Sequence, residues 1–342
     1  MNLKAFKWRG FWGSPLVGLV AVYLGYVLLS ALWSRGFAWL AMADLVRLTL
    51  LVLLFFTITV QLALYDDRFA QRLFFWFALT AGASLIAVFS AVIAGVLPYD
   101  LRLEGFGIAS HPIIGATLYG FALLVAAFVL LPHARSLPER LLWLAIIALC
   151  AAFMLLASSR GPLLALATAS VVGLALADRR MAVAVIGILV AGLLIGLFSE
   201  SRPIQLIFDR PQSGHFSLWK QALEAISEHP WRGHGSLSDI TFLGKRGPQR
   251  SPHNLLLANQ FYGGLPASLL LAALLGGAAL RAVKAAREGA SIYLVLLIFG
   301  LTASLFDSRS LVQNLGREWI TLWLPIGLLA AHHLRDRVHA AS

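Results

Sequence analysis

Long runs of apolar residues, separated by short polar segments, make up most of this chain. The first run, 14–33, carries no charged residue. A bilayer core needs about 20 apolar residues for each helix that crosses it, so the pattern predicts about ten membrane-spanning helices and an all-α, polytopic membrane helix bundle. These predicted spans are 14–33, 45–64, 73–97, 111–131, 139–157, 162–177, 181–198, 254–280, 290–306 and 318–334.

One long polar connection, 199–253, separates two of the predicted spans. Apolar residues recur at helical spacing through 218–226, while Lys220, Gln221 and Glu224 take the opposite face. This pattern predicts an amphipathic helix that lies at the membrane surface. The prolines and glycines from 230 to 252 indicate a loop after it. With no internal repeat, we expect one integral membrane domain over 1–342, with 199–253 as its large loop.

The basic residues of the connections predict the orientation. Every short segment on one side of the predicted bundle is basic, from Lys4 near the N-terminus to Arg337 near the C-terminus, whereas the other side carries few such residues. Cytoplasmic segments are enriched in lysine and arginine, so both termini are expected in the cytoplasm and the 199–253 loop outside it.

Composition limits the possible functions. Only 13% of the residues are charged, against roughly 25% in soluble domains. The net charge of +11 lies in short segments between apolar runs, where orientation and lipid head groups account for it, so membrane lipids and not nucleic acid are the expected partners. The only cysteine, Cys150, excludes a disulfide framework within the chain. No metal site is expected, because the loop histidines lack a regular ligand spacing, and the absence of a nucleotide motif leaves no expected cofactor.

Arg160 stands in the sequence Ser158-Ser159-Arg160-Gly161-Pro162, at the junction of two predicted spans. An arginine near hydrocarbon has two readings. It is either an interfacial side chain that reaches lipid phosphates, or a clamp on a phosphorylated lipid substrate.

His253 directly precedes the predicted helix that begins at 254. Helix N-termini favour anions, and histidine titrates near neutral pH, so this position suits phosphate binding or proton transfer. The simpler alternative is a solvated loop histidine. Two acidic residues have local partners: Asp307 is expected to pair with Arg309, and Asp44 with Arg47.

Four stretches together resemble the superfamily of O-antigen ligases and O-antigen polymerases, which are bacterial envelope glycosyltransferases. These stretches are Arg102-Leu103-Glu104-Gly105 with His111-Pro112, Ser159-Arg160-Gly161-Pro162, Leu218-Trp219 through His229-Pro230-Trp231-Arg232-Gly233-His234-Gly235, and Pro252-His253-Asn254 leading to Gly264. With the helix pattern, they span most of the chain after residue 100.

The resemblance implies a transferase in the bacterial inner membrane. It would move a glycan from an undecaprenyl-diphosphate carrier to an acceptor sugar on the periplasmic face, without metal or nucleotide, and lipid A core is the acceptor of the ligases. His253 would act on the acceptor hydroxyl and Arg160 on the diphosphate. Asn254, Gly264, Arg102 and Trp219 would bind substrate, because they lie in the matching stretches.

This assignment is chemically coherent. Fixed arginines stabilise the charge that develops on a leaving diphosphate. A histidine is suited to take the proton of an attacking hydroxyl, or to orient that hydroxyl. Direct displacement inverts the anomeric centre, which is an expectation from the family.

The sequence also departs from the family pattern. Gly214-His215 stands where the family commonly has glycine and arginine, so His215 or Arg210 is the expected substitute. Ala267 stands where ligases usually have Gly, Thr or Tyr, and the predicted helices are fewer than in typical ligases. These departures keep an O-antigen polymerase as the alternative. From another class, a transporter or flippase for an anionic lipid-linked substrate is possible, but such proteins bind substrate near mid-bilayer.

Overall fold

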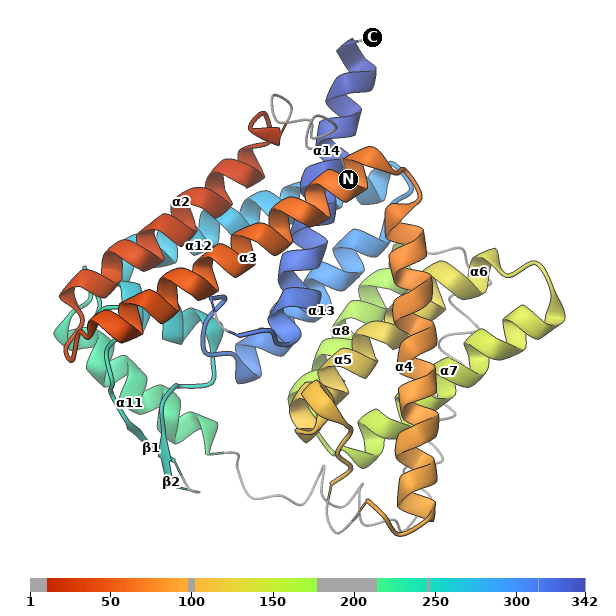
Figure 1. The fold of residues 1–342 in the computed structure, drawn as a ribbon, viewed down its shortest axis with the longest axis horizontal. Helices are drawn as coiled ribbons and strands as arrows, with labels where there is room; N and C mark the ends of the chain where they lie inside the picture. Colours follow the sequence, from red (N-terminus) through yellow and green to blue (C-terminus); the bar gives the residue numbers. More distant parts are fainter. Residues whose placement is uncertain (1–10, 98–101, 177–213, 245–246, 313, 342) are drawn as a thin grey trace. The chain divides into compact units, whose positions relative to one another are not determined.

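The computed structural model describes residues 11–97, 102–176, 214–244, 247–312 and 314–341 (Figure 1). Within these ranges, six helical segments are long and apolar enough to cross a membrane, and α8 (Arg160–Leu176) and α13 (Ile292–Asp307) are shorter apolar helices. The six are Pro15–Trp33, Trp39–Tyr65, Phe69–Ile93, Pro112–His133, Leu137–Leu156 and Leu255–Arg287. The predicted all-α, multi-pass membrane fold is therefore confirmed.

The chain forms two compact units. Unit 1 contains Met1–Asp67, Gln212–Ala285 and Ser304–Ser342, and unit 2 contains Arg68–Pro211 and Ala286–Ala303. The prediction of a single membrane domain over 1–342 remains a prediction.

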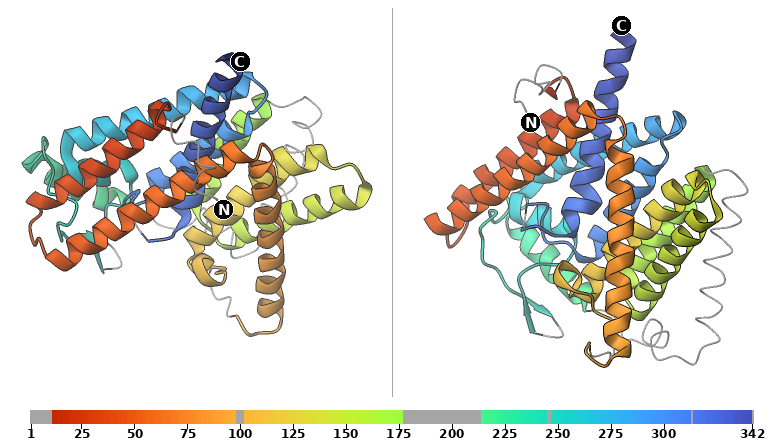
Figure 2. Two further views of the ribbon diagram at one scale, coloured as in Figure 1. Left: turned by 45° about the horizontal axis from the view of Figure 1, so that its top comes forward. Right: turned by 45° about the vertical axis from the view of Figure 1, so that its right-hand side comes forward.

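In unit 1, α2 (Pro15–Ser30) continues into the short 3-10 helix η2 (Ala31–Trp33) and packs against α3 (Trp39–Tyr65). Both views in Figure 2 show these two helices side by side. The π-helical turn η5 (Trp319–Trp323) leads into α14 (Leu324–Ala341), which packs along α3. Apolar side chains with little or no exposed area, such as Phe56 and Trp323, fill the interface between α3 and the η5–α14 segment.

The long helix α12 (Leu255–Arg287) is interrupted at Gly264, which has φ +64° and ψ −162°. Pro266 has no backbone N–H, so the local helical ladder cannot be complete. The polar loop after α11 (His215–Glu228) supplies the missing partners: His234 N–H donates to Phe261 O at 2.8 Å, and Gly235 N–H to Tyr262 O at 2.7 Å. In return, Leu265 N–H donates to Pro230 O at 3.0 Å. The loop is thereby fixed to the membrane helix through its backbone.

The amphipathic helix predicted at 218–226 is confirmed as α11. Its buried face, Leu218 and Ala222, packs with Phe242 and Phe261 in a small apolar cluster. The expectation of an unstructured loop up to residue 252 is wrong, because β1 (Phe242–Gly244) and β2 (Gly247–Gln249) form an antiparallel hairpin. Phe242 explains the difference, since burying its ring against Phe261 favours an ordered strand over a solvated loop.

Unit 2 is built around α5 (Pro112–Val125), nearly all of which is buried. The surrounding helices are α4 (Phe69–Ile93), α7 (Leu137–Leu156) and α8. After α5, the chain continues helically through η4 (Ala126–Leu130) and α6 (Leu131–His133). Ser136 and Glu139 form a capping box at the start of α7, satisfying backbone N–H groups that a helix start leaves free.

The predicted spans coincide with helices wherever the structure describes them. The span 181–198 lies outside the described residues. The largest departure is α12, which the apolar pattern predicts as an uninterrupted helix over 254–280. It extends to Arg287 and is broken at Gly264, because the loop residues that stabilise the break are remote in sequence.

Candidate active site

His253 is held in an unusual backbone conformation immediately before α12. Its φ is +53°, a left-handed value that few residues other than glycine adopt. Its N–H donates to Ser251 Oγ at 3.1 Å, and the Asn254 side-chain oxygen caps α12 by accepting the N–H groups of Leu256 and Leu257, each at 3.0 Å. Such backbone strain persists where the surrounding structure enforces it, and it concentrates at functional sites.

Three alternating charges, those of Glu318, Arg317 and Asp307, form a row that orients the His253 ring. His253 Nδ1 lies 2.5 Å from Asp307 Oδ1, Arg317 donates to Asp307 Oδ2 at 2.9 Å, and Arg317 Nε donates to Glu318 Oε1 at 3.1 Å. Arg317 and Glu318 are almost completely buried, with side-chain exposures of 7% and 4%. A buried arginine with two carboxylate partners is fixed in position, because losing either contact leaves an unpaired buried charge.

The same contacts determine the ionisation of Asp307, which follows the predicted span 290–306. Burial alone would raise the pKa of Asp307, but Arg317 and the hydrogen bond with His253 outweigh burial and hold that pKa well below its ordinary value. Burial likewise disfavours the charged form of Arg317, yet Asp307 and Glu318 raise its pKa. Asp307 is therefore a permanent anion at neutral pH, and it favours a proton on His253 Nδ1.

With the proton on Nδ1, the lone pair of His253 lies on Nε2. Nε2 is 3.2 Å from the side-chain amide of Gln249, at the end of β2. A glutamine amide can present either its oxygen or its NH₂ group, so Gln249 is able to hydrogen-bond Nε2 in either protonation state. The arrangement allows His253 to accept a proton at Nε2 while Asp307 stabilises the resulting positive charge.

His215, the first residue of α11, lies beside His253, with ring centroids 6.0 Å apart. Burial lowers the pKa of His215, Asp307 opposes this effect, and His253 adds to it. Trp219 lies one turn along α11, 6.3 Å from the His215 ring and 6.3 Å from the Phe306 ring. Its indole N–H is buried without a hydrogen-bond partner among the described residues. His253, His215 and Trp219, together with Asn254 at the start of α12, are therefore brought together in unit 1.

Two of the predicted arginines, Arg102 and Arg160, belong to unit 2. Arg102 Nε donates to Ala157 O at 2.8 Å, and its guanidinium also bonds Ser159 Oγ. Ser159 directly precedes Arg160, the first residue of α8, whose side chain is exposed. Ser158 adopts φ +48°, so the chain turns sharply between α7 and α8 at this point. Arg102 thus ties the segment before α5 to the junction that presents Arg160.

The outcomes for the other predicted residues and ion pairs differ from one another. Gly264 lies against the backbone of residues 231–233, and a Cβ there would lie 2.4 Å from Trp231 O, so its contacts are structural. Arg210 lies outside the described residues. The predicted Asp44–Arg47 pair is confirmed at 2.6 Å. The predicted Asp307–Arg309 pair is wrong, because Arg317 and His253 take both carboxylate oxygens of Asp307.

Sequence reasoning missed the roles of Asp307, Arg317, Glu318 and Gln249. A signal was present for three of them, because charged residues between two apolar spans require partners near a membrane. The sequence does not indicate which partners these are. His253 lies 54 residues from Asp307 along the chain, and the spacing of apolar runs contains no information about that contact.

Comparison with known proteins supports an assignment. Residues 142–272 match the protein family described as O-Antigen ligase. The chain is also 30% identical, over 344 aligned positions, to an O-antigen ligase of Pseudomonas aeruginosa, and the alignment covers 97% of this chain and 81% of that protein.

The apolar helices and these similarities define a multi-pass membrane protein with a glycosyltransferase-like activity that ligates lipid-linked glycans. More particularly, the chain belongs to the O-antigen ligase family, and with it to lipopolysaccharide biosynthesis. A lipid-linked glycan and a glycan acceptor are its partners in general terms.

Proposed function

We propose that this protein transfers a glycan from undecaprenyl diphosphate to lipid A core, on the periplasmic face of the bacterial inner membrane and with both termini in the cytoplasm. The observation that carries the proposal is the row Glu318–Arg317–Asp307–His253, which equips a membrane protein of the ligase family with an oriented imidazole. Such a group is needed where a sugar hydroxyl must lose a proton.

In the proposed reaction, the acceptor hydroxyl oxygen attacks the anomeric carbon of the donor sugar. The bond between that carbon and the diphosphate oxygen breaks, and undecaprenyl diphosphate leaves with the electron pair. The hydroxyl proton passes to His253 Nε2, and Asp307 stabilises the imidazolium through Nδ1–H. Displacement from the opposite side inverts the anomeric centre.

Arg160 and Arg102 are proposed to bind the diphosphate. Negative charge grows on the leaving group as the bond breaks, and guanidinium groups that are positioned in advance lower the energy of that state. Arg102 is fixed at Ala157 and Ser159, whereas Arg160 is exposed at the start of a helix. Helix N-termini favour anions, which reinforces the arginine charge. The two arginines supply the charge stabilisation, so the proposed reaction is metal-independent and needs no cofactor.

The remaining substrate-binding assignments stay proposals. Asn254, Trp219 and Gly264 are proposed to contribute to substrate binding, and His215 or Arg210 is proposed to replace the family arginine of the long loop. For Gly264 the contribution is indirect, because its contacts are with the loop backbone.

An O-antigen polymerase is the second candidate, and it differs only in its acceptor, which would be another lipid-linked glycan. The similarity to an O-antigen ligase over 97% of the chain favours the ligase. The transporter or flippase hypothesis receives less support, because His253 and Asp307 lie at the ends of α12 and α13, whereas transporters bind substrate near mid-bilayer.

Purified protein in lipid nanodiscs tests the proposal. We expect undecaprenyl-diphosphate-linked glycan and lipid A core to give a heavier acceptor in mass spectrometry, equally with and without EDTA. Transfer to a second lipid-linked glycan instead would favour the polymerase. No transfer to either acceptor would overturn the enzymatic proposal, and loss with EDTA that Mg²⁺ restores would overturn the metal-independent mechanism.

A further inference from the structure

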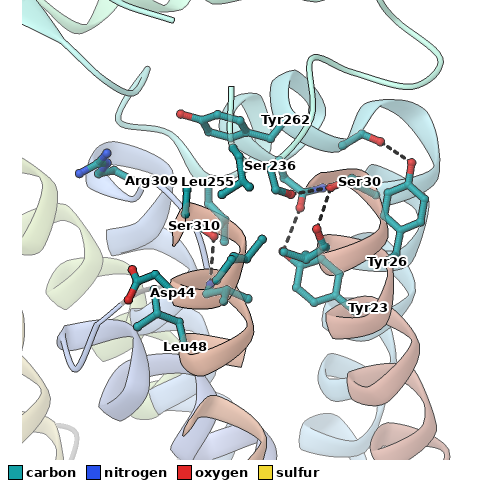
Figure 3. Close-up of a pocket in the computed structure, with 18 of the residues that line it drawn as sticks. Tyr23, Tyr26, Ser30, Asp44, Leu48, Ser236, Leu255, Tyr262, Arg309 and Ser310 are labelled. Carbon is teal, nitrogen blue, oxygen red and sulfur yellow. Dashed lines mark hydrogen bonds between the residues drawn. The ribbon is translucent and has the colours of Figure 1, made fainter. Parts of the chain in front are cut away.

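A cavity of about 320 Å³ lies entirely within unit 1, among α2, α3, α12 and the segment after α13. Binding sites for small molecules typically have about 300–1,000 Å³, so the space is sufficient for a compact ligand. Figure 3 shows Tyr23, Tyr26 and Ser30 of α2 on one side, and Asp44 and Arg309 on the other.

The cavity lies next to His253 and Asp307 along two chain segments. Leu255, which lines it, is two residues after His253, and Arg309, which also lines it, is two residues after Asp307. Asn259 and Tyr262 continue the lining along α12. A ligand in this cavity therefore lies against the same two segments that fix the proposed base.

Asn259 provides an unused hydrogen-bond donor in this cavity. The residue is only 8% exposed, and its side-chain oxygen accepts from the Tyr23 hydroxyl at 2.9 Å. Its NH₂ group is buried and has no partner among the described residues. An unsatisfied buried polar group is unfavourable, so a ligand that accepts from it gains a specific contact.

The polar groups of the lining suit a neutral ligand with many hydroxyl groups. The charged residues of the lining are Arg309 and Asp44, and Asp44 is paired with Arg47 at 2.6 Å. The remaining polar lining consists of hydroxyls, amides and backbone groups. A sugar ring can donate a hydroxyl proton to Asp44 Oδ2 and accept from Asn259 and Arg309, while Tyr23, Tyr26 and Tyr262 supply aromatic surface.

We infer that this cavity is the subsite for the acceptor: it holds the neutral sugar residue whose hydroxyl is to be glycosylated. This inference rests on the proposed function and adds a location to it. The acceptor sugar binds among α2, α3 and α12, and the groups proposed for the donor diphosphate remain Arg102 and Arg160.

Filling the cavity tests the inference without removing any polar contact. Ala41 lines the cavity on α3, whereas Ala43, on the same helix, is exposed and is not part of the lining. The test variant is therefore Ala41→Phe and the matched control is Ala43→Phe. Thermal unfolding of both variants establishes that they fold as the wild type does.

The binding probes are a lipid-free core oligosaccharide and undecaprenyl diphosphate, each titrated separately into protein in nanodiscs. We expect Ala41→Phe to weaken oligosaccharide binding and raise the KM for lipid A core at least about tenfold, with undecaprenyl diphosphate binding and the donor KM unchanged. Ala43→Phe should leave all four quantities unchanged. Asn259→Leu should weaken oligosaccharide binding in the same selective way.

The inference is overturned if Ala41→Phe weakens undecaprenyl diphosphate binding instead, because the cavity then belongs to the donor. It is also overturned if neither probe responds to Ala41→Phe. Failure of the proposed function gives a different result: the wild type then transfers no glycan to lipid A core, whatever the cavity variants do.

Discussion

The His253 cluster in unit 1 (His253, Asp307, Arg317 and Glu318) and the junction between α7 and α8 in unit 2, with Arg102 and Arg160, differ in how their charged side chains are surrounded. In the cluster, Arg317 and Glu318 are buried and every charge has a neighbour of opposite sign. At the junction, Arg102 is anchored to Ala157 and Ser159, but the adjacent Arg160 is exposed. The cluster fixes the orientation of the His253 ring, whereas the junction carries a guanidinium group on an exposed residue. A proton acceptor needs a defined tautomer and direction, and an anion site needs accessible charge.

The largest expected effect comes from removing the imidazole. His253→Ala should lower transfer by about 10²–10⁴-fold, the range of general acid–base contributions, while leaving the thermal midpoint close to that of the wild type. The measurement is the initial rate with saturating donor and lipid A core. His229→Ala, in the same polar loop but outside the cluster, should retain wild-type transfer. Equal rates for His253→Ala and the wild type would remove His253 from the mechanism.

Removing the Arg160 side chain tests the role of the junction between α7 and α8. Arg160→Ala should lower transfer by about 10²–10³-fold, because the leaving diphosphate loses a charge-stabilising group. Arg140→Ala, at an exposed arginine of the same unit near the start of α7, is the control and should have little effect. We expect Arg160→Ala also to weaken undecaprenyl diphosphate binding. If transfer and binding are both retained, the side chain only contacts lipid head groups.

Asp307→Asn distinguishes a positioned imidazole from a free one. An asparagine amide can donate to His253 Nδ1, which places the ring proton on Nε2 and removes the proton acceptor. Transfer should fall by about 10²-fold, the low end of the general-base range, even in protein that remains folded. The exposed Asp239→Asn is the matched control. A wild-type rate in Asp307→Asn would show that the tautomer of His253 does not matter.

His215 tests whether this chain has replaced the arginine of its family. If it has, His215→Arg should retain transfer and His215→Ala should lower it about tenfold, as loss of one hydrogen bond to a charged group implies. The rates of the two variants with saturating acceptor decide the matter. Equal loss in both would point to Arg210.

The smallest expected effect concerns pH. Burial lowers the pKa of His215 in the folded state, so below pH 6.5 the unfolded chain binds more protons than the folded chain. His215 therefore contributes a loss of stability as the pH falls from 7 to 5. The thermal midpoint of the wild type should decrease more over this interval than that of His215→Gln. Equal decreases in the thermal midpoints of the two proteins would contradict a lowered pKa of His215.

The apolar pattern predicted most of the fold because hydrophobic length is a direct consequence of the bilayer. α4, α7 and α13 lie close to their predicted spans. Local chemistry also predicted α11, from its helical periodicity, and the pairing of Asp44 with Arg47, which are one helical turn apart. The hairpin β1–β2 was missed because its ordering depends on Phe261, a residue of the following helix.

The candidate site was predicted only in part, for the same reason. His253, Asn254 and Arg160 follow from short motifs, but the row from His253 to Glu318 depends on contacts between distant segments. Arg309 was the expected partner of Asp307 because it is near in sequence, and Arg317 takes that place because burial makes a strong pairing necessary. Short motifs therefore indicate candidate groups, and only tertiary contacts indicate which groups act as a unit.

The break in α12 limits how this protein can be recombined with its relatives. Gly233 and Gly264 approach so closely that a Cβ on either would lie 2.5 Å from a backbone nitrogen of the other. The two glycines therefore depend on each other, although Gly233 lies in the loop after α11 and Gly264 lies in α12. A chimera that takes residues 214–252 from another ligase and keeps this α12 is expected to fold only if the donor segment also has a glycine at the position of Gly233. Exchange of 214–266 as one block should be better tolerated.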